Sequence, residues 1–237
     1  MAWAAVTLGV FAGIATAAVA AEYPNPERFR EAITAFTEAE ALDAPVRGAI
    51  VATGSSSMRG WHSRIAKDLA PLTIIPRGFG GSNMYDVVHF VQELVLRHQP
   101  RAVLLYEGDN DVAAGVEPQA IVQQFEAFIA VVHESLPETR IYTLSIKPSI
   151  ARWSMWEAMQ TANELLKARC AEDDRLIYVD VATPMLTAEG EPRKDIFVAD
   201  MLHMNDKGYD VWRSVVQPVL LEGELRFEPP ADLETDP

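Results

Sequence analysis

Two residues near the end of the 237-residue chain, Asp200 and His203, stand three positions apart in the stretch Asp-Met-Leu-His. A carboxylate this close to a histidine can accept a hydrogen bond from one ring nitrogen and leave the other to take a proton from a nucleophile. The serines at positions 55–57, which follow Gly54, are the candidates for that nucleophile. Together these residues indicate a serine hydrolase.

Two segments between the serines and the histidine are suited to holding an oxyanion. Gly80 and Gly81 permit backbone conformations that bring an amide close to a ligand. The carboxamide of Asn110 donates hydrogen bonds without titrating near neutral pH. Each feature alone has a structural alternative, because serines cap helices, paired glycines form tight loops and asparagine forms Asx turns. Asp200 and His203 have alternatives too: a helix cap and a surface histidine, or two metal ligands.

Apolar runs with strand character alternate with helical patterns along the chain. Strands are expected at residues 49–53, 72–75, 102–106, 141–145 and 176–180. Helices are expected at residues 27–42, 58–69, 86–98, 119–135, 156–170 and 205–221. The alternation predicts a single-domain, three-layer α/β/α fold around a parallel five-stranded sheet. Function in such folds gathers in loops beyond the carboxyl ends of the strands, where we expect the four chemical segments to meet.

Composition argues against several classes of partner. The formal charge of −14, with no basic stripe, argues against binding to nucleic acid. An acidic surface also gains no attraction to anionic lipids. Cys170 is the only cysteine, so no intrachain disulfide and no cysteine-based metal site can form. Its helical setting predicts a small buried apolar residue.

The first 20 residues are apolar and uncharged, and they end in Ala-Val-Ala, the form of a signal-peptidase site. We expect cleavage before Ala21 and a secreted or periplasmic protein with no stable membrane partner, although no Lys or Arg precedes the apolar run. An uncleaved anchor and a misassigned start are the alternatives. Residues 21–46 are expected to form a helical extension, residues 47–222 the main domain, and residues 223–237 a peripheral acidic tail.

Four short blocks, taken in order, resemble those of the SGNH hydrolases, also called the GDSL family. The blocks lie at residues 54–57, 77–82, 108–111 and 200–203. The resemblance covers nearly all of the sequence after the leader and implies the family's flavodoxin-like architecture. One departure is Ser55, which stands where the family's first block usually carries aspartate.

The resemblance implies acyl transfer to serine and then to water, without a cofactor or a metal. Ser56 would attack an ester carbonyl while His203 removes its proton and Asp200 orients the ring. The amides of Ser56 and Gly81 and the side chain of Asn110 would form the oxyanion hole.

Two other functions use the same residues differently. A metal-dependent phosphohydrolase would take its ligands from Glu107, Asp109, Asp111, Asp200 and His203. A noncatalytic relative would bind esters or carbohydrates without cleaving them.

The substrate is less clear than the reaction. Arg59 and Trp61 near the nucleophile, and Trp153 after the fourth strand, are candidates for lining an acyl or sugar pocket, together with Met155 and Trp156. Aromatic side chains at these spacings also pack against helices. Because no extended apolar lid is evident, we expect an esterase for short-chain carboxylic esters, including acetyl groups on carbohydrates. A lipase or lysophospholipase of the same family is the alternative.

Overall fold

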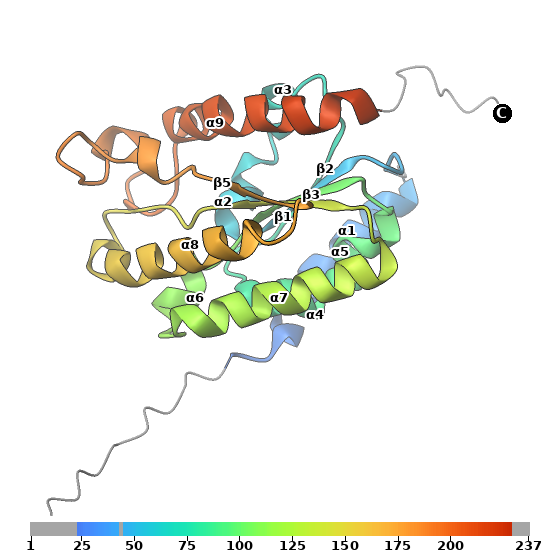
Figure 1. Cartoon of the computed structure of the whole chain (residues 1–237), viewed down its shortest axis with the longest axis horizontal. Helices are drawn as coiled ribbons and strands as arrows, with labels where there is room; N and C mark the ends of the chain where they lie inside the picture. The colour runs from blue at the N-terminus through green and yellow to red at the C-terminus, as the bar shows by residue number, and fades with distance from the viewer. Residues whose placement is uncertain (1–22, 43–44, 229–237) are drawn as a thin grey trace, which may run out of the picture.

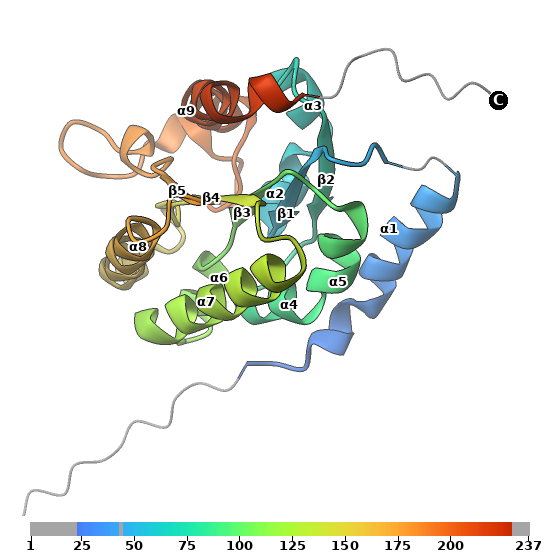
Figure 2. The ribbon, with the colours of Figure 1, turned by 45° about the vertical axis from the view of Figure 1, so that its right-hand side comes forward.

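The computed structural model describes residues 23–42 and 45–228. Its sheet has five parallel strands in the order β2-β1-β3-β4-β5 (Figures 1 and 2). The strands are β1 (Ile50–Gly54), β2 (Ile74–Gly78), β3 (Ala102–Tyr106), β4 (Arg140–Leu144) and β5 (Leu176–Val179). The α-helices are α1 (Arg30–Leu42), α2 (Ser56–Trp61), α3 (Ile65–Asp68), α4 (Met84–His89), α5 (Val91–Leu94), α6 (Asp109–Ala113), α7 (Pro118–Ser135), α8 (Trp156–Cys170) and α9 (Asp206–Glu224). Short 3-10 helices are η1 (Pro26–Phe29), η2 (Leu96–His98), η3 (Trp153–Met155), η4 (Thr183–Met185), η5 (Lys194–Ile196) and η6 (Leu225–Phe227).

Helices cover both faces of the sheet. Side chains alternate along a strand, so Ile50 and Ala52 pack with α2, α3 and α9, whereas Val51 packs with α1, α4, α5, α7 and α8. Figure 1 shows α9 on one side of the strands and α7 and α8 on the other, and Figure 2 shows α1, α4 and α5 on the side of α7. Burial on both faces explains why the strands read as continuous apolar runs.

The predicted α/β fold is confirmed, with all five strands in the expected order and within a few residues of their expected bounds. Cys170 is buried at the end of α8, also as expected. Two predicted helices are wrong as continuous elements. The helix expected at 58–69 is split into α2 and α3, and the helix expected at 86–98 is split into α4, α5 and η2.

The break between α2 and α3 has a physical cause in tertiary contacts. His62 leaves the helical ladder with its ring Nε2 accepting a hydrogen bond of 2.9 Å from the Gly78 amide. Arg64 takes a non-helical conformation and bonds to Asp68, and its guanidinium also reaches Asp210 of α9. These contacts outweigh the weak helical propensity of a short segment.

Both ends of the described chain belong to the packed unit. Ile33 of α1 is 2% exposed and enters the same cluster as α4 and α5, so the predicted helical extension packs directly on the sheet layer. The peripheral tail predicted from residue 223 is wrong for its first residues. Glu224 is fully buried against Arg140 and Tyr142, and Glu228 accepts a hydrogen bond of 2.8 Å from the Thr73 amide.

The predicted leader at residues 1–20 and the last residues of the tail, 229–237, lie outside the described residues. Across 23–42 and 45–228, no helix combines the length and apolar character needed to cross a membrane.

Candidate active site

Ser56 is the first residue of α2, immediately beyond β1. The turn between them depends on Gly54, whose φ is +132° and whose missing side chain leaves room for β3, because an added Cβ would lie 2.0 Å from the Tyr106 carbonyl oxygen. The next amide, of Ser55, donates to that same carbonyl at 3.1 Å. The chain is thus fixed to β3 just before Ser56, whose side chain is half-buried at the carboxyl end of the sheet.

The three predicted residues Ser56, His203 and Asp200 lie in one hydrogen-bonded line. Nδ1 of His203 lies 2.6 Å from Oδ2 of Asp200, and Nε2 lies 2.8 Å from Oγ of Ser56. With Nδ1–H donating to the carboxylate, Nε2 is left as an acceptor for the serine hydroxyl proton. Ser55 and Ser57 are buried and away from this line, with hydroxyl oxygens that find no hydrogen-bond partner in the described part of the chain.

Asp200 is held as a carboxylate. Its Oδ1 accepts hydrogen bonds of 2.9 Å from the amides of Leu202 and His203, in addition to the ring contact at Oδ2. These bonds, first the one from the His203 ring, lower the pKa of Asp200 to about 2. Asp200 is therefore ionised across the neutral range.

The loop that carries Asp200 and His203 is tied to the segment that follows β4. Met201 has a φ of +56°, which turns the backbone sharply between the two residues. Its carbonyl accepts from the Ala151 amide at 3.0 Å, and the Leu202 carbonyl accepts from Nζ of Lys147 at 2.9 Å. The loop is also closed on itself by the Val198 amide, which donates to the His203 carbonyl at 2.9 Å.

Asn110, in the first turn of α6, binds the loop that contains Gly81. Its Nδ2 donates to the Ser82 carbonyl at 2.7 Å, and its Oδ1 accepts from the Arg152 guanidinium at 2.9 Å. One N–H of the carboxamide is therefore used on the loop and the second is left over. Gly81 itself is exposed, with a φ of +87°. The structure thus ties Asn110 to the residue that follows Gly81.

The loop that follows β2 and contains Gly80 and Gly81, which we call the glycine loop, also packs against α2, the helix that carries Ser56. An added Cβ at Gly78 would lie 2.4 Å from the Arg59 amide nitrogen, and one at Gly80 would lie 2.7 Å from the Arg59 guanidinium carbon. Burial lowers the pKa of His62 to about 4, so at neutral pH its ring is neutral and can accept from the Gly78 amide. The start of α2, the glycine loop and α6 therefore form one connected unit.

Buried titratable side chains support these loops from behind. Lys147 is 1% exposed and lies 3.8 Å from Asp109, which also pairs with Arg152 at 3.1 Å. Burial lowers the pKa of Lys147, and the nearby carboxylate of Asp109 offsets part of this effect. Glu107 accepts from the Ser82 hydroxyl at 2.6 Å, and burial holds the pKa of Glu107 well above its usual range.

Comparison with known proteins decides the family. Residues 18–211 match the GDSL-like Lipase/Acylhydrolase family. The chain belongs to this family. No curated protein matches the chain.

Solved structures from several organisms share this fold. A protein assigned as a platelet activating factor from Streptococcus pneumoniae aligns with a TM-score of 0.72 and 19% identity, over 81% of this chain and 92% of that one. A GDSL-like lipase from Bacteroides thetaiotaomicron aligns with a TM-score of 0.68 and 20% identity, over 84% of this chain and 98% of that one. A carbohydrate esterase from Talaromyces cellulolyticus aligns with a TM-score of 0.57 and 17% identity, over 75% and 97%. At these identities the likeness shows the fold alone.

The five side chains considered for a phosphohydrolase metal site have other partners in the part of the chain that the structure describes. Glu107 binds Ser82, Asp109 pairs with Lys147 and Arg152, and Asp200 faces the His203 ring. Asp111 accepts from the Met84 amide at 3.1 Å and from the Tyr23 hydroxyl at 3.0 Å. Among the residues that the structure describes, no group of three or more His, Cys, Asp or Glu side chains could hold a metal ion.

Only part of the predicted substrate surface is accessible. The prediction for Trp61 is wrong: its ring is fully buried, stacks on Tyr209 at 6.0 Å and donates from Nε1 to Asp68 at 2.7 Å. Arg59 is exposed beside Gly80. Trp153 is partly exposed and lines a pocket of about 190 Å³.

Sequence reasoning missed Lys147 and Arg152, which hold the histidine loop and Asn110. One signal for Lys147 was present, because it lies three positions beyond the end of β4 and directly after the apolar Ile146, where a side chain is expected to be buried. A charged residue in such a place is paired far more often than not. Arg152 carried no comparable signal.

Proposed function

We propose that this GDSL-family protein is a serine esterase that hydrolyses short-chain carboxylic esters through an acyl-enzyme intermediate. The observation that carries the proposal is the line from Asp200 through His203 to Ser56, with contacts of 2.6 and 2.8 Å. A base already within hydrogen-bond distance of the hydroxyl, and itself oriented by a carboxylate, is the arrangement that activates a serine.

In the first half of the reaction, Oγ of Ser56 bonds to the ester carbonyl carbon as Nε2 of His203 takes the hydroxyl proton. The carbonyl π electrons move to oxygen and return as the bond to the alcohol oxygen breaks. His203 gives its proton to the leaving alcohol. Asp200, ionised because its pKa is about 2, stabilises the ring while it is positively charged.

In the second half, water replaces the alcohol. His203 takes a proton from the water molecule as the water oxygen attacks the acyl carbon. The bond between the acyl carbon and Oγ of Ser56 then breaks. The proton returns to Ser56 and the carboxylic acid leaves. The acid, the alcohol and the free enzyme account for all atoms of the ester and the water.

The proposed oxyanion donors are the amides of Ser56 and Gly81 and the second N–H of Asn110. The proposal for Asn110 rests on its two fixed contacts, to the Ser82 carbonyl and to Arg152. The guanidinium at Oδ1 draws electron density from the carboxamide and strengthens its N–H as a donor. Loss of one such donor typically costs about 3–4 kcal/mol of transition-state stabilisation.

The preference for short, soluble esters rests on an open site. Side chains of His203 and Asp200 are 41% and 47% exposed, and Trp61, which could have walled an acyl tunnel, belongs to the core. A longer-chain acylhydrolase is the second candidate, because Val198 and Met201 expose apolar side chains on the same loop as His203. Export of the protein remains a proposal that rests on the apolar leader at residues 1–20.

A panel of p-nitrophenyl esters from acetyl to decanoyl, run beside phospholipid vesicles, tests this function. We expect kcat/KM to be highest between acetyl and butyryl and to disappear in Ser56→Ala. A steady rise to decanoyl, or a clear preference for vesicles, would favour the second candidate instead. N-terminal sequencing of the mature protein from culture medium or periplasm tests export, with Ala21 expected as the first residue.

A further inference from the structure

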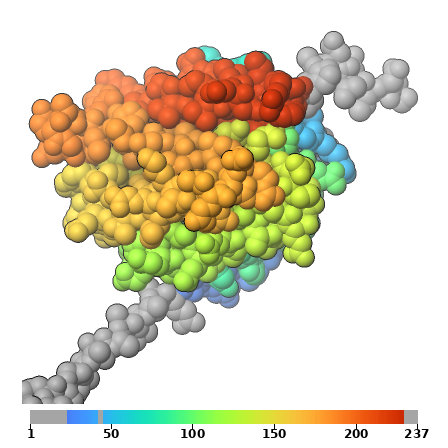
Figure 3. Space-filling model, in the orientation of Figure 1, coloured from blue at the N-terminus to red at the C-terminus, as the bar shows by residue number. Residues whose placement is uncertain are grey.

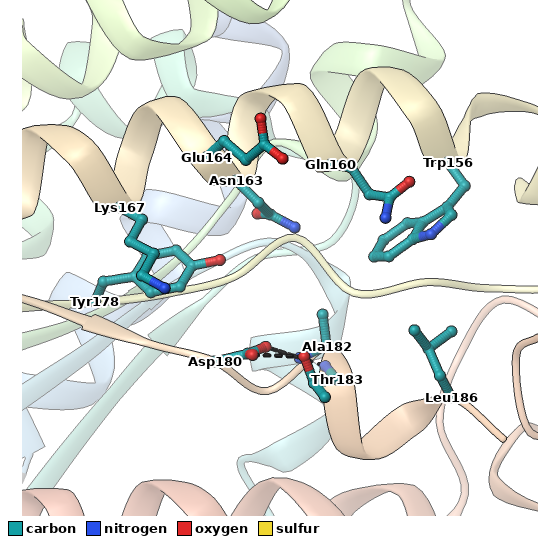
Figure 4. Close-up of a pocket in the computed structure, with 10 residues that line it drawn as sticks. All are labelled: Trp156, Gln160, Asn163, Glu164, Lys167, Tyr178, Asp180, Ala182, Thr183 and Leu186. Carbon is teal, nitrogen blue, oxygen red and sulfur yellow. Dashed lines mark hydrogen bonds between the residues drawn. The ribbon is translucent and has the colours of Figure 1, made fainter. Parts of the chain in front are cut away.

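Two pockets adjoin each other beyond the histidine loop. The first, of about 220 Å³, lies between α8 and the segment that leaves β5. Figure 4 shows Trp156 and Gln160 reaching from α8 toward the segment of Thr183 and Leu186, with Lys167 beside Tyr178. The second, of about 190 Å³, is lined by Trp153 and by the segment between η4 and η5.

Contacts between their walls place these two pockets side by side, and we call the two together the tryptophan groove. The indoles of Trp153 and Trp156 stack with ring centroids 5.8 Å apart and planes 18° apart, so that each pocket has one of them as a wall. On the opposite side, Leu186 of the first pocket and Pro192 of the second form an antiparallel bridge. In Figure 3 the segment between η4 and η5, coloured orange, forms a lobe at the left edge beside the yellow α8.

The groove begins next to the candidate active site. Ile150 and Trp153, which line the second pocket, flank Ala151 and Arg152 in sequence. Ala151 binds the Met201 carbonyl at 3.0 Å and Arg152 binds Asn110 at 2.9 Å. The far pocket lies at the end of β5, which is three strands from β1, or about 14 Å away across the sheet. A small ester at Ser56 cannot reach that far.

The walls have the chemistry that sugars require. Flat indole faces suit the apolar C–H faces of a pyranose ring, and nearby polar groups suit its hydroxyls. Gln160, Glu164 and Lys167 line the first pocket, are exposed, and form no hydrogen bond or ion pair within 23–42 and 45–228. They offer both donors and acceptors. Acidic and basic side chains both line the groove, Glu164 and Lys167 in the first pocket and Glu191 and Lys194 in the second, and the chain's charge of −14 disfavours an anionic polymer.

We propose that the tryptophan groove binds a neutral glycan chain several sugars long, whose acyl group is presented to Ser56. The inference rests on the proposed esterase function and adds its substrate class. An oligosaccharide spans from the far pocket to Ser56, whereas p-nitrophenyl acetate contacts only the active site. Groove residues therefore affect KM for the oligosaccharide and leave hydrolysis of the small ester unchanged.

The test compares acetylated xylo-oligosaccharides of one to six sugars with p-nitrophenyl acetate. We expect kcat/KM to rise with oligosaccharide length for the native protein. Trp156→Ala and the double variant Gln160→Ala/Lys167→Ala raise KM for the hexamer about tenfold, which corresponds to the loss of one aromatic or polar contact. Phe227→Ala, which removes an exposed ring at the opposite end of the sheet, is the matched control. It leaves the KM for both substrates unchanged.

Two outcomes overturn the groove. One is an equal kcat/KM for the acetylated monomer and hexamer. The other is an equal loss of activity on the hexamer and on p-nitrophenyl acetate in Gln160→Ala/Lys167→Ala. Titration of xylohexaose into Ser56→Ala, followed by calorimetry, separates the groove from the reaction. Binding that Trp156→Ala abolishes supports the groove even if no ester is cleaved, in which case the proposed function fails by itself. An active esterase that does not bind xylohexaose overturns the groove alone.

Discussion

The two ends of the sheet use charge in opposite ways. At the amino end, Glu224 is fully buried and receives hydrogen bonds from Arg140 at 2.7 Å and Tyr142 at 2.8 Å, while Arg101 lies 3.3 Å away. At the carboxyl end, His203 and Asp200 keep 41% and 47% of their side-chain surface exposed. The first set of charges is satisfied within the protein. The second set is partly exposed, and it holds the imidazole Nε2 of His203 against the Ser56 hydroxyl at 2.8 Å.

This difference separates residues that fasten the fold from residues that are left available for chemistry. Removing a charge at the amino end should affect stability and leave the reaction alone. Removing a polar group at the carboxyl end should affect the reaction more than stability. Lys147 is the informative intermediate, because it is as buried as Glu224 but its contact is the histidine loop.

The largest expected effect is at the proposed nucleophile. Ser56→Ala should lower kcat by about a millionfold, as expected for loss of a nucleophile that acts as a unit with its base. Ser55→Ala and Ser57→Ala are matched controls, because both hydroxyls are buried without a hydrogen-bond partner in the described chain. Their kcat on p-nitrophenyl acetate should stay within a few-fold of the native value. An active Ser56→Ala beside an inactive Ser57→Ala would reverse the assignment.

The next effect is at Asn110. Asn110→Ala should lower kcat by about 100- to 1,000-fold with little change in KM, because its free N–H matters most once the carbonyl oxygen carries charge. Steady-state kinetics on the preferred ester measures both parameters. A raised KM with native kcat would leave Asn110 as a residue that only shapes the Ser82 loop through its 2.7 Å hydrogen bond.

Lys147 and Glu224 test the comparison itself. Lys147→Met keeps a long apolar chain but removes the donor to the Leu202 carbonyl, so kcat should fall on the order of tenfold to a hundredfold through misplacement of His203. Glu224→Leu leaves Arg140 without its carboxylate partner and Arg101 with Glu228 alone, and should lower the free energy of unfolding by about 3 kcal/mol with native kcat. Denaturant unfolding and kinetics on both variants provide the measurements. If Glu224→Leu lost kcat at a temperature where it is folded, the two ends would not be separable.

The smallest effect concerns pH and Asp111. Burial raises the pKa of Asp111 to about 7, above its value in the unfolded chain. The folded state therefore holds this proton more tightly, so its contribution makes stability fall as pH rises from about 4 to 7 and stay level above that. Asp111→Asn should flatten this part of the profile, measured as the free energy of unfolding at pH 5, 6, 7 and 8. An unchanged slope would mean that Asp111 is already ionised at pH 5.

Local sequence patterns were enough to predict most of the fold and of the candidate site. Continuous apolar runs, alternating with helical patterns, located the five strands in order, and the loops beyond them located Ser56, Asn110 and the histidine loop at one edge. Patterns of this kind depend only on neighbouring residues, and the chemistry of each block can be read from its own few side chains.

What the sequence did not predict depends on contacts between distant residues. Trp61 is buried because Tyr209 and Trp212 of α9 cover it, and nothing near position 61 indicates that. Glu224 finds Arg140 across 84 positions, which turned an expected tail into an anchored helix end. Arg152 reaches Asn110 across 42 positions, so its support of the oxyanion side was visible only in three dimensions.

Covalent trapping of the nucleophile tests the central claim most directly. A fluorophosphonate should form a phosphorus–oxygen bond with Oγ of Ser56 and release fluoride, because His203 lies 2.8 Å from that oxygen and can take its proton. Peptide mapping by mass spectrometry should find one adduct, on Ser56, which is lost in His203→Ala. An adduct on Ser55 or Ser57, or an active esterase that is neither labelled nor inhibited, would contradict the account.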